Sequence, residues 1–316
     1  MTFDEYLVAR RNEVEGALEA FLSTSPATPA VIVDAMHYSL LGGGKRLRPL
    51  LALASAEGVA QAIGASESAA RDLAMPAACA LEMIHTYSLV HDDLPSMDDD
   101  HLRRGRPTSH VVHGEGMAVL AGDGLQAEAF HLLAREPQGL HPTLMMRKLR
   151  VLALVAEAAG PAGMVGGQAI DLTAAGREAA AAKAAALQTM TKDELRDMHA
   201  RKTGALIRAA VAAGAIMGGA DDKLFAALDQ YGTEIGLAFQ IVDDILDEEG
   251  SAASLGKTAG KDRAGGKPTY LAFFGLDQSR ELADECRNNA RSALERAGLL
   301  DSRLADIASW IIDRKT

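Results

Sequence analysis

Apolar residues recur along much of the chain at intervals of three and four positions, the spacing that places them on one face of a helix. A sustained alternation of apolar and polar residues, which would indicate strands, does not occur in the sequence. Ala, Leu, Met, Glu and Arg dominate, and all five favour helices. The pattern predicts an all-α protein, and its clearest window comprises Phe225, Leu228, Tyr231, Ile235, Phe239, Val242 and Ile245.

Clusters of glycine and proline divide this helical pattern into segments. None of them has the composition of a domain linker, so we expect a single domain over residues 1–316. The alanine-rich segment 174–190 is of low complexity and predicts a surface helix with little burial. The predicted breaks are residues 42–49, Pro95, and residues 136–142, 159–163, 218–221 and 250–268.

The composition, with 48% apolar and 24% charged residues, is that of a globular protein. A net charge of −11 argues against nonspecific binding of nucleic acid. No CxxC or Cys/His spacing surrounds Cys79 or Cys286, which argues against a disulfide framework and a zinc site. The N-terminal residues do not resemble a signal peptide, and the most apolar stretch, 205–220, is short and interrupted by Arg208. We expect a soluble, cytoplasmic protein without membrane insertion.

Two groups of aspartates contrast with this helical background. In the second group, Asp243 and Asp247 are four residues apart within the strongest helical window, which stacks both carboxylates on one helix face. Gln240 and Gly236 continue the same face toward the start of the helix. A solvated acidic face is the alternative, but the apolar neighbours leave little room for it. A face that holds metal ions is therefore favoured.

The first group lies in the stretch LVHDDLPSMDDDHLRRG (89–105), where Asp92 and Asp98 are six residues apart. An unbroken helix would separate them by about 240° around its axis. Pro95 predicts instead that the helix ends or bulges near Leu94, so that the chain can turn Asp98 back toward Asp92. A solvated acidic loop is again the alternative. Two carboxylate pairs suit Mg²⁺ ions that take their remaining ligands from a diphosphate, and the EF-hand spacing is missing.

Basic residues accompany both groups, as a diphosphate ligand would require. A triple glycine precedes Lys45, Arg46 and Arg48, but arginine follows the lysine and no predicted strand precedes it, so this is not a P-loop. Each cation taken alone is an ordinary surface residue, and only their combination with the aspartates indicates a site. The other candidates are Arg103, Arg104, Arg106, Lys202 with its neighbour Thr203, Lys257 and Lys267.

Seven short motifs follow one another along the chain: YSLLGGGKRLRP, IHTYSLVHDDLPSMDDDHLRRGRPTSH, AGDGLQAEAF, GGQAIDL, KTGALIRAA, GLAFQIVDDILD and GGKPTY. This combination resembles the trans-isoprenyl diphosphate synthases, most of all the bacterial farnesyl diphosphate synthases, over roughly residues 35–275. The resemblance implies the isoprenoid synthase fold, a bundle of antiparallel helices around a central active-site cavity with the two aspartate motifs on facing walls. It also implies a homodimer.

The resemblance implies a role for each candidate residue. Asp92 and Asp98 would bind two Mg²⁺ ions and Asp243 a third, with Mn²⁺ as the alternative metal. The other implied roles are support of these ligands by Asp93, Asp244 and Asp247; contact with an allylic diphosphate by Arg103, Lys202, Lys257 and Lys267; binding of isopentenyl diphosphate by Gly44, Lys45, Arg48, His85 and Arg104; and placement of Thr203 and Gln240 beside the reacting carbon.

The activity that the resemblance implies is a head-to-tail condensation of isopentenyl diphosphate with dimethylallyl and geranyl diphosphates, which yields farnesyl diphosphate and diphosphate. In the family, the residues four and five positions before the first aspartate, here Ser88 and Tyr87, line the floor of the pocket for the growing chain. Because a helix rises 1.5 Å per residue, Tyr87 lies about 7–8 Å below Asp92. Its bulky ring favours a fifteen-carbon product.

Three alternatives stay open. A geranylgeranyl diphosphate synthase shares every motif and differs mainly in pocket depth. A noncatalytic regulatory subunit of a related prenyltransferase would usually lose one aspartate motif, and a helical cation-binding protein would not need the basic residues. Two positions depart from the family pattern: His101 stands where relatives usually carry Asp or Asn, and Arg201 stands where His is common.

Overall fold

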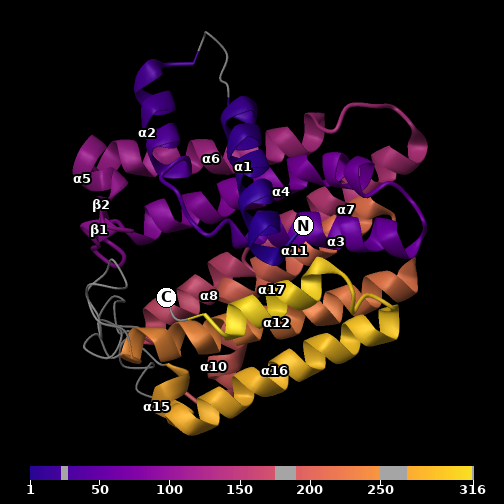
Figure 1. Ribbon diagram of the computed structural model, residues 1–316. Coiled ribbons are helices and arrows are strands. Elements are labelled where there is room, and N and C mark those ends of the chain that lie inside the picture. Colours follow the sequence, from indigo (N-terminus) through magenta and orange to yellow (C-terminus); the bar gives the residue numbers. More distant parts are fainter. Residues whose placement is uncertain (23–27, 175–189, 250–268, 315–316) are drawn as a thin grey trace. The chain divides into compact units, whose positions relative to one another are not determined.

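The computed structural model describes residues 1–22, 28–174, 190–249 and 269–314. Nearly all regular structure in these ranges is helical, which confirms the predicted all-α class (Figure 1). One hairpin, β1 (Leu102–Arg103) paired antiparallel with β2 (Arg106–Pro107), is not predicted by the pattern because two-residue strands are too short to show an alternation. The chain forms two compact units, unit 1 with residues 1–154 and 210–221 and unit 2 with residues 155–209 and 222–316.

Unit 1 is built around α4 (Glu67–Asp92), which packs against α3 (Leu47–Ala62) and α6 (Glu115–Arg135). Every residue of α4 from Pro76 to Ile84 is buried, so the middle of this helix runs through the core and is covered on all sides. The other helices of the unit are α1 (Phe3–Phe21), α2 (Ala30–Leu40), α5 (Ser109–His113), α7 (Pro142–Ala159) and α11 (Ala205–Gly218), the last two of which continue into unit 2.

The apolar, glycine-containing stretch in α11 serves helix packing within unit 1. A Cβ atom on Gly214 would lie 2.0 Å from the carbonyl oxygen of Ala52 in α3, so only glycine allows the two helices to approach this closely. Ser55 Oγ of α3 donates a 2.8 Å hydrogen bond to the carbonyl oxygen of Val211 at the same crossing. This stretch of α11 is therefore a core element of unit 1.

Two stretches, 67–92 and 142–174, are long and apolar enough to cross a membrane by length and hydropathy alone. In α4, 72% of the most apolar window is buried inside the protein, as in the core helices of soluble proteins. A turn at residues 160–163 divides the second stretch into helices of 18 and 11 residues. Both are shorter than the roughly 20 residues that a spanning helix needs.

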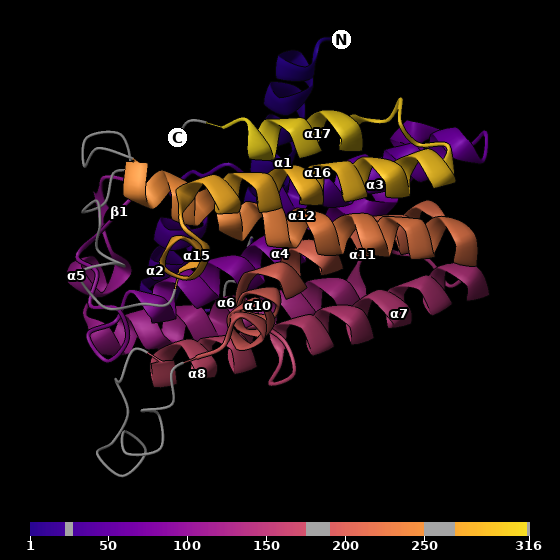
Figure 2. The same cartoon turned by 90° about the horizontal axis from the view of Figure 1, so that it is seen from below.

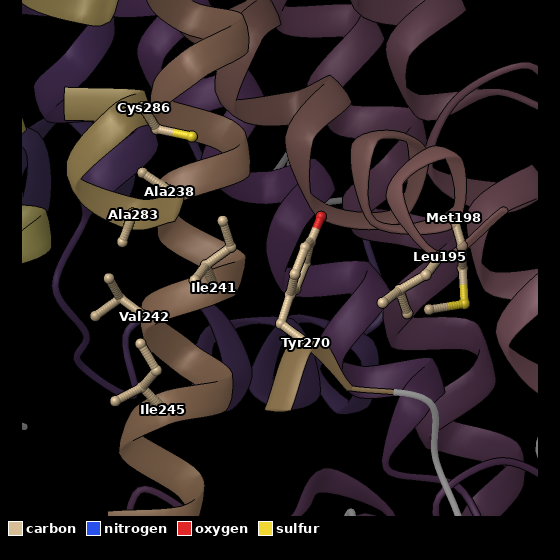
Figure 3. Packing of buried hydrophobic residues seen from close by; sticks show 9 residues of the cluster. All are labelled: Leu195, Met198, Ala238, Ile241, Val242, Ile245, Tyr270, Ala283 and Cys286. Atoms are coloured by element: carbon tan, nitrogen blue, oxygen red, sulfur yellow. The ribbon is translucent and has the colours of Figure 1, made fainter. Parts of the chain in front are cut away.

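Unit 2 is centred on α12 (Asp222–Glu249), which runs beside α16 (Leu276–Ala297) in both views (Figures 1 and 2). The apolar window predicted for 225–245 forms the buried face of α12, where Ile241, Val242 and Ile245 belong to one core cluster with Tyr270 (Figure 3). The other elements are α8 (Met164–Ala174), α10 (Lys192–His199), a π-helical turn η1 (Ala200–Gly204), α15 (Tyr270–Phe274) and α17 (Arg303–Ile312).

Three of the predicted breaks coincide with helix ends. The break at 136–142 lies between α6 and α7, that at 159–163 between α7 and α8, and that at 218–221 between α11 and α12. The predicted surface helix at 174–190 and the predicted break at 250–268 lie almost wholly outside the described residues.

Candidate active site

The end of α4 brings Asp98 next to Asp92 in unit 1. The helix ends at Asp92, two residues before the position expected from Pro95, and the turn that follows doubles back. The amide of Asp98 donates a 2.8 Å hydrogen bond to the carbonyl oxygen of Asp92. The turn is anchored by an apolar cluster of Val90, Leu94, Met97 and Ala118. The predicted return of Asp98 toward Asp92 is confirmed.

Asp93, which caps α4 and is only 4% exposed, forms a forked ion pair with Arg103 of β1. Arg103 Nε and Nη2 donate to Oδ1 at 2.8 and 2.6 Å, and Nε also lies 3.0 Å from Oδ2. Burial by itself would lower the pKa of Arg103, but the hydrogen bonds and the charge of Asp93 outweigh it and raise this pKa. The guanidinium is therefore charged and held in one orientation.

The loop between α2 and α3 contacts the hairpin through Arg104. This arginine donates a hydrogen bond to the carbonyl oxygen of Gly43. A Cβ atom on Gly44, whose φ is +146°, would lie 2.5 Å from Nη1 of Arg104, so the absence of a side chain at Gly44 makes room for the guanidinium. Arg103, Arg104 and Arg106 are among the residues that line a cavity of about 60 Å³. The hairpin thus presents a concentration of positive charge suited to an anion.

His85 of α4 lies in the field of several arginines. Its side chain is half-buried, and Arg48 of α3 is 7% exposed. Burial, followed by the charges of Arg48, Arg104 and Arg103, holds the pKa of His85 well below its usual value, so its imidazole is neutral at pH 7. Lys45, next to Gly44, is exposed. An anionic ligand in this field would offset the repulsion between the guanidinium groups.

Arg46 lies in the same loop but has a structural role. It is 2% exposed, and its Nε and Nη1 lie 2.6 Å from Glu15 and 2.8 Å from Glu82. Its Nη2 also donates to the carbonyl oxygen of Leu40. These contacts fix the loop that carries Lys45. The guanidinium of Arg46 makes its hydrogen bonds within the protein and is not directed at a ligand.

Tyr87 is 6% exposed and lies on α4, five residues before Asp92. Burial, and then the charge of Asp92, raise the pKa of Tyr87 to about 12, so its hydroxyl stays protonated. The ring meets His91 edge-on, with 5.7 Å between ring centroids. Ser88 Oγ donates to the carbonyl oxygen of His85 at 2.8 Å. The tyrosine ring is therefore a rigid, neutral obstacle close to the aspartate end of the helix.

In unit 2, Asp243 and Asp247 lie four residues apart on the uninterrupted helix α12, as predicted. The Asp243 side chain is 53% exposed, and its Oδ1 accepts a 2.7 Å hydrogen bond from Nη2 of Arg314. The Arg314 guanidinium also stacks on the ring of Phe239, 4.2 Å from its centroid. A positively charged group thus already occupies this carboxylate face.

A chain of hydrogen bonds fixes Gln240 on the same helix. Thr203 Oγ1 of η1 donates to Gln240 Oε1 at 2.9 Å, and Gln240 Nε2 donates to Asp244 Oδ1 at 2.8 Å. Asp244, 7% exposed, also accepts a 2.7 Å bond from the amide of Tyr270. The predicted neighbours Thr203 and Gln240 are thus brought together, and Asp244 orients the amide of Gln240.

Lys202 projects from η1, a π-helical turn of the kind often found at functional sites. Its Nζ donates to the carboxylate of Asp171 in α8, which is 6% exposed. The two elements cross at Gly167, where a Cβ atom would lie 2.2 Å from the amide nitrogen of Lys202. This contact fixes the base of the lysine, while Asp171 holds its ammonium group.

Sequence reasoning does not single out Asp171 or Arg314. Asp171 lies in the GGQAIDL motif, whose match to the family is the signal that could have identified it. No comparable pattern surrounds Arg314. Two sequence-predicted ligands, Lys257 and Lys267, lie outside the described residues.

The donor atoms fit hard divalent cations such as Mg²⁺, which prefer carboxylate oxygens and complete their shells with phosphate and water. In unit 1 the backbone turn brings Asp92 and Asp98 together, and in unit 2 the guanidinium on Asp243 acts as a stand-in cation. Each unit also carries a basic side chain that a buried carboxylate holds in place, Arg103 by Asp93 in unit 1 and Lys202 by Asp171 in unit 2. A helical protein that binds diphosphates through divalent metal ions would need these features.

The family model described as polyprenyl synthetase matches residues 29–306, and the chain belongs to this family. A farnesyl diphosphate synthase from Geobacillus stearothermophilus is 41% identical over 99% of this chain and 98% of its own length. A geranylgeranyl diphosphate synthase from Cyanophora paradoxa is 40% identical over 98% of this chain and 95% of its own.

Solved structures agree with this assignment. The crystal structure of an FPP/GFPP synthase from Zymomonas mobilis has a TM-score of 0.79 and 33% identity, and it covers 98% of each chain. A geranyltransferase from Legionella pneumophila has a TM-score of 0.77 and 30% identity, with coverage of 97% of this chain and 96% of that one. The protein is a prenyltransferase of the trans-prenyl diphosphate synthase type, with their all-α fold.

Proposed function

We propose that the protein is a farnesyl diphosphate synthase. It condenses isopentenyl diphosphate first with dimethylallyl diphosphate and then with geranyl diphosphate, and releases diphosphate each time. The observation that carries this proposal is that each aspartate group is accompanied by a cation held in place by a buried carboxylate, Arg103 by Asp93 and Lys202 by Asp171. The buried ring of Tyr87, on the helix that ends at Asp92, favours the fifteen-carbon product.

Arg103 and Lys202 bind the diphosphate of the allylic substrate. Asp92, Asp98 and Asp243 would hold Mg²⁺ ions, or Mn²⁺ in their place, and these ions would supply positive charge that stabilises the departing diphosphate. Because Arg103 and Lys202 are already oriented, little reorganisation is needed as negative charge develops on the leaving group. We assign support of this site to Asp93, Asp244 and Asp247, and further contacts with the diphosphate to Lys257 and Lys267.

Isopentenyl diphosphate is bound by the cationic group of unit 1. Arg48 and Arg104 neutralise its charge, neutral His85 donates a hydrogen bond, and Lys45 and the backbone at Gly44 contact the phosphate oxygens. Binding there holds the carbon–carbon double bond next to the allylic carbon, which removes much of the entropic barrier to attack. The new carbon–carbon bond forms as the allylic carbon loses diphosphate.

Thr203 and Gln240 stabilise the allylic carbon while it carries positive charge. The hydrogen bonds of Gln240 to Thr203 and Asp244 fix its amide, so the oxygen dipoles of the pair are oriented before the reaction. After the bond forms, a proton leaves the adjacent carbon and passes to the released diphosphate. Its loss restores a double bond, and the longer allylic diphosphate can react again.

Tyr87 limits the product to fifteen carbons. Tyr87→Ala removes a buried ring on the helix that ends at Asp92, so we expect products of twenty carbons or more. Tyr87→Phe is the matched control, because it keeps the ring and loses only the hydroxyl. Reverse-phase separation of products labelled from isopentenyl diphosphate checks this. If Tyr87→Ala still stops at fifteen carbons, another residue sets the length.

A geranylgeranyl diphosphate synthase is the second candidate. Relatives with that name from Cyanophora paradoxa and Catharanthus roseus are 40% and 43% identical to this chain. Their identity is close to that of the farnesyl diphosphate synthase, so similarity alone does not separate fifteen from twenty carbons. The buried ring of Tyr87 is the observation that favours the shorter product.

Arg314 competes with the metal for Asp243. Arg314→Gln removes the guanidinium, and we expect the Mg²⁺ concentration for half-maximal activity to fall by up to about fivefold, since a partly exposed ion pair contributes at most about 1 kcal/mol. Arg287→Gln, which removes an arginine paired with Asp284 and Asp313, is the control. An unchanged or higher Mg²⁺ requirement in Arg314→Gln would exclude the competition.

We also propose that residues 1–316 act as one catalytic domain and that the protein is a cytoplasmic homodimer. Aliphatic side chains on α5 and α6 are 39–55% exposed, a feature typical of surfaces that become buried on association. These exposed aliphatic side chains are Val111, Val112, Val119 and Leu120. Sedimentation equilibrium of the purified protein tests whether it is a dimer.

The condensation itself is tested by release of diphosphate, coupled to a pyrophosphatase and a phosphate assay. We expect release only when isopentenyl diphosphate, an allylic diphosphate and Mg²⁺ are all present, and loss of the signal on addition of a chelator. Release that is independent of isopentenyl diphosphate would indicate hydrolysis. The absence of any Mg²⁺-dependent release would favour a noncatalytic subunit.

A further inference from the structure

We propose that Asp99, His101 and His110 form a second metal site, which takes a transition-metal ion such as Zn²⁺ or Co²⁺ and is separate from the Asp92–Asp98 pair. One carboxylate oxygen of Asp99 and one ring nitrogen of each histidine lie within 4.8 Å of one another. The three residues lie at the base of the hairpin, two before β1 and one after β2.

The tautomer of His110 is set by Thr108. The single hydroxyl hydrogen of Thr108 is donated to the carbonyl oxygen of Asp100 at 2.7 Å. The same oxygen lies 3.1 Å from His110 Nδ1, so Nδ1 must supply the hydrogen in that contact. In the neutral ring the lone pair then lies on Nε2. A neighbour that accepts a hydrogen bond from one ring N–H and leaves the other nitrogen with its lone pair is the usual arrangement around a metal-binding histidine.

The lone pair on His110 Nε2 is buried and unused. His110 is 8% exposed, and Nε2 has no hydrogen-bond partner in the part of the chain that the structure describes. A buried polar nitrogen left without a partner destabilises the folded protein. Because a bound cation would satisfy this nitrogen, His110 is the fixed ligand of the proposed site.

His101 and Asp99 are the adjustable ligands. The amide of Thr108 donates a 3.1 Å hydrogen bond to the carbonyl oxygen of His101, and the ring centroids of His101 and His110 lie 5.7 Å apart. His101 Nε2 lies 3.7 Å from Asp99 Oδ1, and these side chains are 72% and 60% exposed. Ligands bound at about 2.1 Å lie at most about 4.2 Å apart. Rotation of the two exposed side chains can close the site to that size.

The donor set selects a different ion from the aspartate pairs. Two imidazoles and one carboxylate suit Zn²⁺, Co²⁺, Ni²⁺ or Fe²⁺, whereas Mg²⁺ prefers oxygen ligands only. An ion there would tie together the two ends of the hairpin that carries Arg103 and Arg104. The inference concerns metal binding and does not depend on the proposed prenyl transfer.

The test is a titration of the full chain with Co²⁺ in the presence of millimolar Mg²⁺, followed by the visible absorption of the bound ion. We expect one Co²⁺ per chain, displaced by Zn²⁺. Affinity should fall about tenfold or more in His101→Asn and in His110→Gln, and about 10- to 100-fold in Thr108→Val, which releases the ring of His110. His131→Asn is the control, because this exposed histidine lies 3.4 Å from Glu128 but belongs to no group of three such ligands among the residues that the structure describes.

Two outcomes would overturn the proposal. The first is an unchanged affinity for Co²⁺ in His101→Asn. Because His101 is exposed, this substitution carries little risk to folding. Displacement of Co²⁺ by Mg²⁺, together with loss of binding in Asp92→Asn, would place the ion in the aspartate pair instead. Retention of Co²⁺ binding in Asp92→Asn supports the second site, whether or not that variant condenses substrates.

Discussion

Replacement of Asp92 by asparagine is expected to lower kcat/KM for the condensation by about 10³-fold or more. The substitution keeps the size of the side chain and the backbone bond from the Asp98 amide to the carbonyl oxygen of residue 92, and it removes only the charge. Weaker binding of a metal ion that stabilises the leaving group raises the activation free energy by several kcal/mol. An increase of about 4 kcal/mol corresponds to a 10³-fold lower rate. Steady-state kinetics with labelled isopentenyl diphosphate over a range of Mg²⁺ concentrations measure the effect.

The matched control is Asp72→Asn. Asp72 is exposed on the same helix, α4, and a surface substitution of this kind should change the rate by no more than about twofold. Circular dichroism of both variants checks that the helix content is unchanged. A rate for Asp92→Asn within about tenfold of the unmodified protein would contradict the role of this carboxylate.

Lys202→Met is expected to lower kcat by about 10²–10³-fold, the usual cost of removing one preorganised group that stabilises a charge developing in the transition state. The ammonium group acts mainly on the departing diphosphate, so KM for the allylic substrate should change much less than kcat. Single-turnover measurements separate the effect on the chemical step from the effect on binding of the allylic substrate. Lys223→Met, on the exposed start of α12, should leave both parameters near their original values.

Removing Lys202 also leaves Asp171 as a buried carboxylate without its lysine, which threatens the fold as well as the reaction. The double variant Lys202→Met/Asp171→Leu replaces the ion pair with apolar side chains and should recover stability without recovering activity. Thermal unfolding and rate measured side by side distinguish the two effects. If the double variant regained activity, Lys202 would have only a structural role.

The parts of the fold that depend on local rules are predictable from the sequence. The spacing of apolar residues identifies the buried face of α12, and the same spacing places Asp243 and Asp247 together on its exposed side. Pro95 predicts the end of α4 to within two residues and the return of Asp98. In each case the partners lie within seven positions of each other, so backbone geometry alone relates them.

Contacts between distant segments are not predictable in this way. Arg46 and Arg48 are two positions apart and look alike in the sequence, yet Arg46 is committed to Glu15 and Glu82. Likewise, Asp171 holds Lys202 and Arg314 covers Asp243 across 31 and 71 positions. Which charges pair is decided by helix packing, because a buried charge must find a partner wherever the fold provides one.

The most direct test of the proposed function is the chain length of the product. Purified protein is incubated with labelled isopentenyl diphosphate, Mg²⁺ and either dimethylallyl or geranyl diphosphate, and the products are separated by length. We predict a fifteen-carbon product from both primers. A twenty-carbon product would contradict the farnesyl assignment, and no Mg²⁺-dependent product from either primer would contradict the catalytic role.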